Sequence, residues 1–168
     1  MKNQETQILD EIKKVVKLKG TVQRARRIWV STDSENLLTL CTWLKDHGFA
    51  HLSAISATDW LEKGYFEVTY HVWSYTDKLL ITVKTTINRK KPSIESVTQI
   101  WGENAQIHER ELHELFGVNF KGNDDLAPLF LDNWQGPPPF MKDFDWRTYV
   151  QEKFYDKNNE REQVYYDE

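Results

Sequence analysis

Two histidines and the acids between them form the part of this sequence that is most similar to a metal site. The run from His108 to His113 reads HERELH, and the zinc-binding helix of metalloproteases reads H-E-x-x-H. That helix places its histidines four residues apart, so that both rings face one ion. The spacing here is five, which separates the rings by about 140° around a helix axis. His47 and His51 have the right spacing, but Gly48 indicates that a helix has already ended. We therefore predict no metal site.

Other residue types that carry chemistry lack the partners they would need. Cys41 is the single cysteine, and one thiol cannot form an internal disulfide or a cysteine-ligated zinc or iron–sulfur site. Asp124, Asp125 and Asp132 lie in a Pro- and Gly-rich loop, where aspartate is a usual turn residue. The sequence has no G-x-x-x-x-G-K-[ST] phosphate loop and no G-x-S-x-G elbow. We predict no catalytic, cofactor-binding or metal-binding residue in this chain.

Apolar periodicity predicts an α+β fold. Helical spacing of apolar residues predicts helices over residues 5–19, 32–47, 93–101 and 104–116. Strand patterns occupy residues 21–31, 49–60, 65–75 and 79–87, the last two as a hairpin. Thr32 with Glu35 fits a capping box for the second helix, and Ser93 fits the cap of the third. This order predicts a mainly antiparallel β-sheet packed with helices on one face.

The pattern changes after the last predicted helix. Residues 1–120 are predicted to form the α+β domain, and residues 121–168 an irregular Pro/Gly-rich, partner-binding segment with an extended C-terminal arm. Glycines and a proline run at 137–139 prevent long regular elements. Aromatic residues continue to Tyr165 and Tyr166, although disordered tails usually lack them. We therefore expect the arm to become ordered on a partner.

The stretch from His108 to Asp143 carries an ordered signature. It resembles the 30 kDa subunit family of respiratory complex I, or NADH dehydrogenase, and of related membrane-bound energy-converting hydrogenases and sulfur reductases. The matching residues are Glu109-Arg110-Glu111, Leu115-Phe116-Gly117, Phe120 with Gly122, Asp125-Leu126, Leu131-Asp132, Trp134 and Lys142-Asp143. Upstream matches are Ala57-Thr58-Asp59-Trp60 and Pro92-Ser93-Ile94. The resemblance covers residues 20 to 150.

The sequence departs from the family pattern at several places. His113-Glu114 replaces an aromatic residue followed by aspartate, and Phe140-Met141 replaces Leu-Arg. Several of the changes remove an arginine, which is a favoured interface residue because its planar fork pairs bidentately with carboxylates. We infer a diverged branch, of the hydrogenase or sulfur-reductase kind.

The resemblance implies a cofactor-free structural subunit of an ion-translocating membrane complex. Such a subunit is not itself catalytic and docks on the hydrogenase-like large (49 kDa-type) subunit, near a small iron–sulfur subunit, with the membrane arm reached indirectly. Iron–sulfur clusters are expected in the partner subunits only. The implied location is peripheral, at the cytoplasmic face of the cell membrane. The residues expected at the partner interface are Glu109, Arg110, Glu111, Glu114, Phe116, Gly117, Asp132, Trp134, Lys142 and Asp143.

Two other classes of function remain open at this point. A stand-alone enzyme of another type would show turnover by the isolated chain. A nucleic-acid-binding module would use the basic stretch Lys13–Arg27, which has seven Lys or Arg and no acid, with Trp29 nearby. The net charge of −4 speaks against nucleic acid as a partner. No run approaches the about 18 apolar residues of a membrane-spanning helix, and the N-terminus has no hydrophobic signal core.

Overall fold

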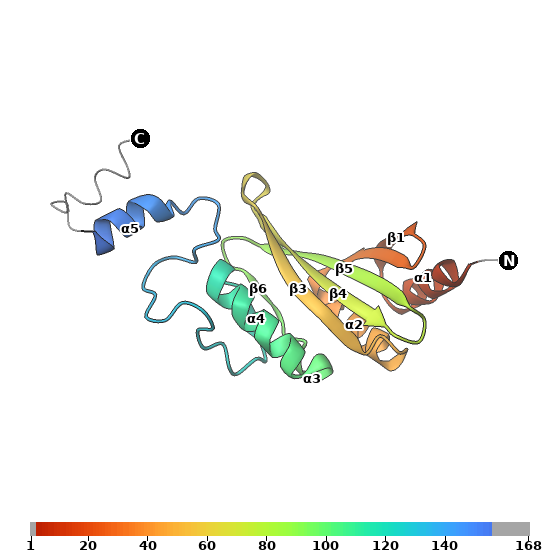
Figure 1. Cartoon of the computed structure of the whole chain (residues 1–168). Helices are drawn as coiled ribbons and strands as arrows, with labels where there is room; N and C mark the ends of the chain where they lie inside the picture. Colours follow the sequence, from red (N-terminus) through yellow and green to blue (C-terminus); the bar gives the residue numbers. More distant parts are fainter. Residues whose placement is uncertain (1–2, 156–168) are drawn as a thin grey trace.

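A five-stranded mixed sheet forms the centre of the molecule (Figure 1). The computed structural model describes residues 3–155, so Tyr165 and Tyr166 of the predicted arm lie outside the described residues. The strand order is β1-β2-β5-β4-β3. The strands are β1 (Leu18–Arg24), β2 (Arg27–Thr32), β3 (His51–Trp60), β4 (Tyr65–Ser74) and β5 (Leu79–Asn88). The β2–β5 pair is parallel and the other three pairs are antiparallel, which confirms the predicted α+β class.

Helices cover one face of this sheet. They are α1 (Gln4–Val15), α2 (Leu37–Asp46), α3 (Thr98–Trp101) and α4 (Glu103–Phe116), with short 3-10 turns η1 (Ser34–Asn36) and η2 (Leu61–Lys63). Alternate residues of β4 and β5 point into the core, as the strand period of two requires. Ile12 of α1, Leu40 of α2 and Leu112 of α4 belong to the same buried cluster as Tyr70 of β4. The opposite face of the sheet is left uncovered by these helices.

The region predicted as one long helix and one strand is a shorter helix followed by a hairpin. Helix α1 ends at Val15 rather than at residue 19, and residues 21–31 belong to two strands, β1 and β2. Arg26, at φ 62°, forms the turn between them. The prediction of Leu18 in the helix is wrong, because its pairing with Thr32 across the hairpin outweighs the small contribution of helix propensity.

Two predicted helix caps are also wrong. Thr32 ends β2, and its hydroxyl donates to the carbonyl oxygen of Lys17 at 3.0 Å instead of capping a helix. Ser93 begins β6 (Ser93–Glu95), which pairs in parallel with β7 (Asn119–Lys121). The helix expected from Ser93 shrinks to α3. The two cap predictions were wrong because serine and threonine also occur in strands, where a neighbouring chain segment supplies the hydrogen-bond partner of the hydroxyl group.

The segment after β7 is irregular, as predicted, until one short helix. We call residues 122–155 the arm. It contains α5 (Trp146–Phe154). The N-cap of α5 is Asp145, whose carboxylate accepts from the backbone N–H groups of Arg147 and Thr148. Figure 1 shows α5 and α1 at opposite ends of the molecule. Within residues 3–155, no helix is long and apolar enough to cross a membrane.

Candidate functional site

Glu114 binds the arm through three backbone N–H groups. Its carboxylate accepts from Leu129 at 3.2 Å, from Phe130 at 2.9 Å and from Leu131 at 2.6 Å. Burial is the largest influence on the pKa of Glu114 and raises it, but the three donors together hold the pKa below its ordinary value. An ionised carboxylate on α4 therefore fixes three consecutive residues of a segment that has no regular structure.

Arg110 and Gln106 extend this contact along the same side of α4. Arg110 donates from Nε to the carbonyl oxygen of Ala127 at 3.0 Å and from a terminal nitrogen to that of Pro128 at 2.9 Å. Gln106 donates to the carbonyl oxygen of Asp125. Residues 106, 110 and 114 are four apart, so they lie in one row on the helix. We call this row the clasp, because it satisfies backbone groups of the arm that no sheet or helix satisfies.

Glu109 lies inside the molecule, which corrects its prediction as a residue that faces a partner. It is 0% exposed. Its carboxylate accepts from the Val97 N–H at 2.7 Å, the Ser96 hydroxyl at 2.7 Å and the Asn123 amide at 2.8 Å. Burial raises its pKa more than these three donors lower it. The side chain joins the turn before α3 to the start of the arm, and it has no surface left for another subunit.

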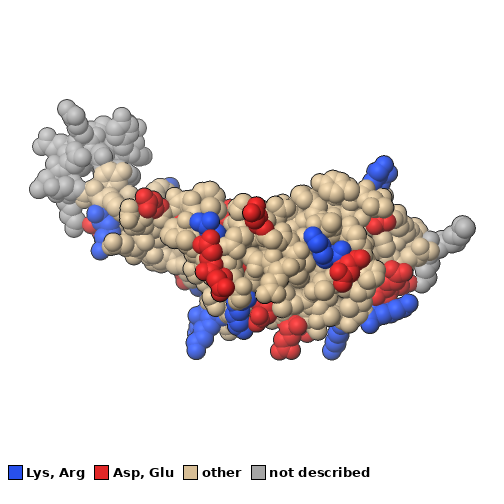
Figure 2. Space-filling view, turned by 90° about the horizontal axis from the view of Figure 1, so that it is seen from below, with Lys and Arg blue, Asp and Glu red and all other residues tan. Residues whose placement is uncertain are grey.

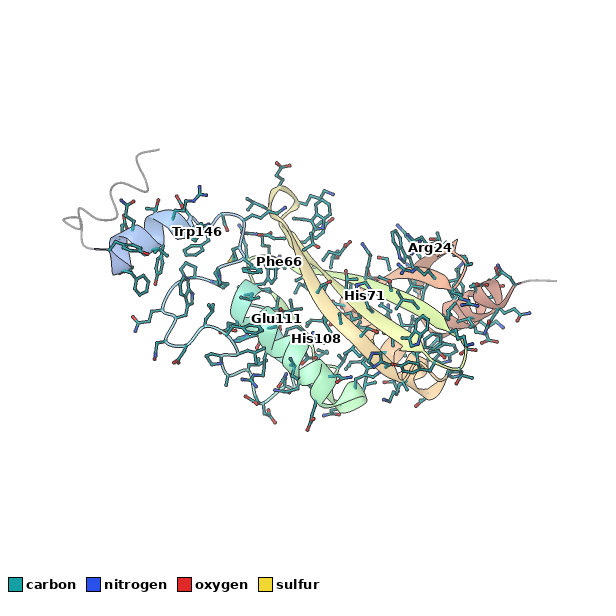
Figure 3. The ribbon with its side chains drawn as sticks, viewed as in Figure 1. Arg24, Phe66, His71, His108, Glu111 and Trp146 are labelled. Atoms are coloured by element: carbon teal, nitrogen blue, oxygen red, sulfur yellow. The ribbon has the colours of Figure 1, made fainter. Side chains whose placement is uncertain are left out.

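Figure 3 shows His108 and Glu111 on α4. His108 Nδ1 lies 3.8 Å from the Glu111 carboxylate. His113 has a different partner, since its Nδ1 lies 2.9 Å from the carbonyl oxygen of Val118. No group of three or more His, Cys, Asp or Glu within residues 3–155 is arranged to hold a metal ion.

Phe116 and Gly117 seat the arm against the end of α4. The Phe116 ring packs edge-on against Phe66 of β4 and Phe140 of the arm, with centroids 5.9 and 5.7 Å apart. Gly117 has φ 73°, and a Cβ there would stand 3.0 Å from Cγ of Pro138. A side chain at this position would therefore be strained and would also press on the proline run.

Lys142 and Asp143 are tied to the sheet by a buried ion pair that the sequence did not reveal. Arg89 donates to both carboxylate oxygens of Asp59, at 2.8 and 3.0 Å, and also to Asp143 at 3.0 Å. The backbone N–H of Lys142 donates to Asp59 at 3.0 Å. The Arg89 guanidinium lowers the pKa of both aspartates. The residues gave no signal for this ion pair, because Asp59 is placed opposite Phe66 on the buried face only by the register of β3 and β4.

Trp134 lies at the centre of an aromatic cluster in the arm. Its ring contacts Phe144 and Tyr149, with centroids 6.0 and 5.0 Å away, and its indole N–H donates to the carbonyl oxygen of Pro137 at 2.9 Å. Asp132, nearby, is exposed. A hollow of about 250 Å³ lies between the clasp and this cluster. It is lined by His113, Glu114, Leu126, Pro128, Leu131, Trp134, Gly136 and Pro138.

The arm also exposes large apolar side chains. The exposed fractions are 65% for Phe130, 58% for Phe140, 55% for Trp146 and 68% for Phe154. A run of exposed aromatic residues is typical of a surface that another molecule covers. The structure thus brings most of the predicted interface residues to one end of the molecule, where several of them hold the arm in place.

The family model described as respiratory-chain NADH dehydrogenase, 30 Kd subunit, matches residues 30–150, and the chain belongs to this family. A subunit of F(420)H(2) dehydrogenase from Methanosarcina mazei is 35% identical over 121 residues, which are 71% of this chain and 76% of that one. A subunit of NADH-quinone oxidoreductase from Phocaeicola vulgatus is 40% identical over 96 residues, which are 56% of this chain and 18% of that one.

Among solved structures, one chain of the membrane-bound sulfane sulfur reductase, an archaeal respiratory membrane complex, has the same fold. It superposes with a TM-score of 0.82 at 27% identity, over 94% of this chain and 95% of that one. The resemblance inferred from the residues is thereby confirmed. The prediction that the signature residues face a partner stays a prediction, apart from Glu109.

Proposed function

We propose that this chain is a cofactor-free structural subunit of a membrane-bound, ion-translocating oxidoreductase, and that it docks through its arm on a hydrogenase-like large subunit. It would lie at the cytoplasmic face of the membrane and be held there by partner subunits. The iron–sulfur clusters would belong to those partners, among them a small iron–sulfur subunit. The role of the chain is positional, because it keeps the large subunit in its working geometry.

The observation that carries this proposal is the clasp. Glu114, Arg110 and Gln106 hold residues 125–131 of the arm by their backbone groups, which leaves the side chain of Phe130 free to face outward. Trp146 and Phe154, farther along the arm, are also exposed. A rigid support that presents aromatic anchors lowers the entropy lost when a partner binds.

Two similarities to known proteins support the proposal. The solved chain from the sulfane sulfur reductase complex matches 94% of this chain, a share that extends into the arm. In Phocaeicola vulgatus the match occupies only 18% of the NADH-quinone oxidoreductase chain, so a segment similar to this protein is continuous there with further sequence.

The test is recovery of partners from native membranes. The tagged full-length chain would be purified after gentle solubilisation, and co-purifying proteins identified by mass spectrometry. We expect a hydrogenase-like large subunit, a small iron–sulfur subunit and membrane proteins. Recovery of the chain by itself from the soluble fraction would overturn the proposal.

A pair of variants then tests docking through the arm. The double variant Trp146→Ala, Phe154→Ala should lower recovery of the large subunit about tenfold or more, because exposed aromatic anchors dominate interface energy. The control is Ile107→Ala, which removes a side chain that is 51% exposed on α4 rather than on the arm. Unchanged recovery for the double variant, together with a loss for Ile107→Ala, would place the contact on α4 instead.

A further inference from the structure

The face of the sheet opposite the helices carries a concentration of positive charge. We call this surface the open face. In β2, β4 and β5 its charged residues alternate with the core residues of their strands, which places them on the uncovered side. In β1, Lys19 pairs with Ser31 of that side, and a register shift after Val22 brings Arg24 opposite Arg27. They are Lys19 and Arg24 of β1, Arg27 of β2, Lys84 of β5 and Glu67 of β4. Four cations thus face one carboxylate, in a chain whose net charge is −4.

Most of these cations have no carboxylate opposite them in the sheet. Arg24 is directly across from Arg27 in the β1–β2 pair, and like charges in that position repel. Lys19 and Lys84 flank Ser31 from the two neighbouring strands. Within the described strands, Lys84 is the cation of this face that has an acid nearby, Glu67 at 2.8 Å. By contrast, acidic and basic side chains are interspersed on the face of the molecule that Figure 2 shows.

Trp29 lies among these cations. Its side chain is 43% exposed, and the Lys84 ammonium lies 5.6 Å from its ring centroid. A hollow of about 180 Å³ opens beside it, between the two lysines. The hollow is lined by Lys19, Gly20, Thr21, Trp29, Val30, Ser31 and Lys84. It therefore offers two ammonium groups, two hydroxyls and one aromatic surface within one small depression.

His71 and Arg24 are both visible in Figure 3, on β4 and near the end of β1. His71 is the neighbour of Thr82 in the centre of the open face. Burial lowers its pKa, and the charges of Lys84 and Arg27 lower it further. The imidazole thus experiences a positive potential that extends from β2 across to β4.

We propose that the open face is a second docking surface, which receives an acidic segment of a partner subunit with one carboxylate between Lys19 and Lys84 beside Trp29. This inference rests on the proposed function, since the partner is a subunit of the same complex. An acidic polypeptide fits this hollow better than a nucleic acid, because two ammonium groups and one aromatic ring beside a single small depression suit one carboxylate rather than a run of phosphates. Exposed tryptophan next to cations is also typical of protein interfaces.

The basic stretch noted in the sequence does not form one surface. Lys13 and Lys14 lie in the last turn of α1, on the helix side of the sheet, whereas Lys19 and Arg27 lie on the open face. This division supplies a matched pair of double variants. Lys19→Glu, Arg27→Glu and Lys13→Glu, Lys14→Glu change the net charge equally, and all four residues are exposed.

The experiment measures partner recovery with the tagged full-length chain expressed in its native host. Lys19→Glu, Arg27→Glu should lower recovery of the partner subunit about tenfold relative to Lys13→Glu, Lys14→Glu, because it places acid against acid. Folding should not suffer, since a glutamate at position 27 faces Arg24 and replaces a repulsive pair with an attractive one. Equal recovery for the two double variants would overturn the inference while leaving the proposed function intact.

A photo-crosslinking residue at position 29 identifies the occupant directly. We expect crosslinks to an Asp- or Glu-rich peptide of another subunit of the complex. Crosslinks to nucleic acid, to lipid or to a second copy of this chain, or a chain that assembles fully without any crosslink at position 29, would each overturn the inference. If the unsubstituted chain recovers no partner at all, the proposed function fails first.

Discussion

The body of the molecule and its arm are stabilised by different kinds of interaction. In the body, residues 3–121, apolar side chains such as Leu40, Tyr70 and Ile81 are fully buried between sheet and helices. In the arm, residues 122–155, most aromatic side chains are partly or largely exposed. The arm is attached by hydrogen bonds that α4 and Arg89 donate or accept, with few apolar contacts beside them, such as those of Leu126, Met141 and Phe140.

This difference shows how a chain can extend a surface beyond its core. The body has the apolar burial needed for cooperative folding. The arm lacks it and depends on the body for its conformation, so it should open locally at much lower cost than global unfolding. The two regions can therefore be separated by mutation, and four variants sharpen the comparison.

Replacing Arg89 by Met should have the largest effect, because Arg89 serves both regions. Asp59, 3% exposed, would retain a buried charge without its guanidinium, and Asp143 would lose its link to the sheet. We expect the free energy of unfolding in urea to fall by about 3–5 kcal/mol. Chymotrypsin cleavage of the arm should also become faster. Lys90→Met, at an exposed neighbour, is the control, and equal urea midpoints for the two variants would contradict the prediction.

Replacing Leu40 by Ala should affect the body only. Leu40 is 0% exposed in α2, and its truncation leaves a cavity in the core. We expect the free energy of unfolding to fall by about 2–5 kcal/mol. The initial rate of chymotrypsin cleavage in the arm should stay unchanged under native conditions. Thr39→Ala, on the exposed side of the same helix, controls for helix propensity. Faster arm cleavage in the Leu40 variant would argue against two separable regions.

Replacing Glu109 by Gln should lower the free energy of unfolding by about 1–3 kcal/mol, because both carboxylate oxygens accept hydrogen bonds and an amide nitrogen cannot. Its effect on pH dependence has a definite sign. The folded pKa of Glu109 is raised above 4.5, so its contribution to stability is present below pH 4.5 and is lost as the pH rises through the folded pKa. The Glu109 variant should lack this decrease in stability with rising pH, and urea titrations at several pH values would measure it. The control Glu111→Gln should keep the decrease.

Replacing Glu114 by Gln should have the smallest effect on the body and act on the arm. Three backbone N–H groups would lose an ionised acceptor, which should lower the free energy of local opening of the arm by about 1 kcal/mol. Cleavage of the arm should then be about fivefold faster. The folded pKa of Glu114 is lowered, so its contribution is present above pH 4.5 and is lost as the pH falls. Cleavage of the wild-type arm by pepsin, a protease that is active in acid, should therefore accelerate as the pH falls below 4.5, and the variant should show less of that acceleration. Glu103→Gln is the control on the same helix.

Elements with long, regular patterns were predictable from the residues. Helix α4 and the β4–β5 hairpin appear close to their predicted bounds, because their apolar periodicity agrees with their packing. The hairpin of β1 and β2 was missed, because each strand is short and the turn uses Arg26 in a left-handed conformation instead of glycine. Ser93 and Thr32 were wrongly predicted to cap helices, because a hydroxyl side chain fits both a helix cap and a strand.

By itself, the sequence determined the α+β class, the irregular arm and the family, because periodicity, proline content and an ordered signature are all local properties of the chain. Only the tertiary structure decided what the signature residues do. Glu109 and Arg110 are adjacent in sequence, yet one is buried inside the molecule and the other holds the arm. Asp59 and Arg89 meet Asp143 across 84 and 54 residues of sequence. Such partners depend on which helix face meets the sheet, and that is set by the packing of the whole chain.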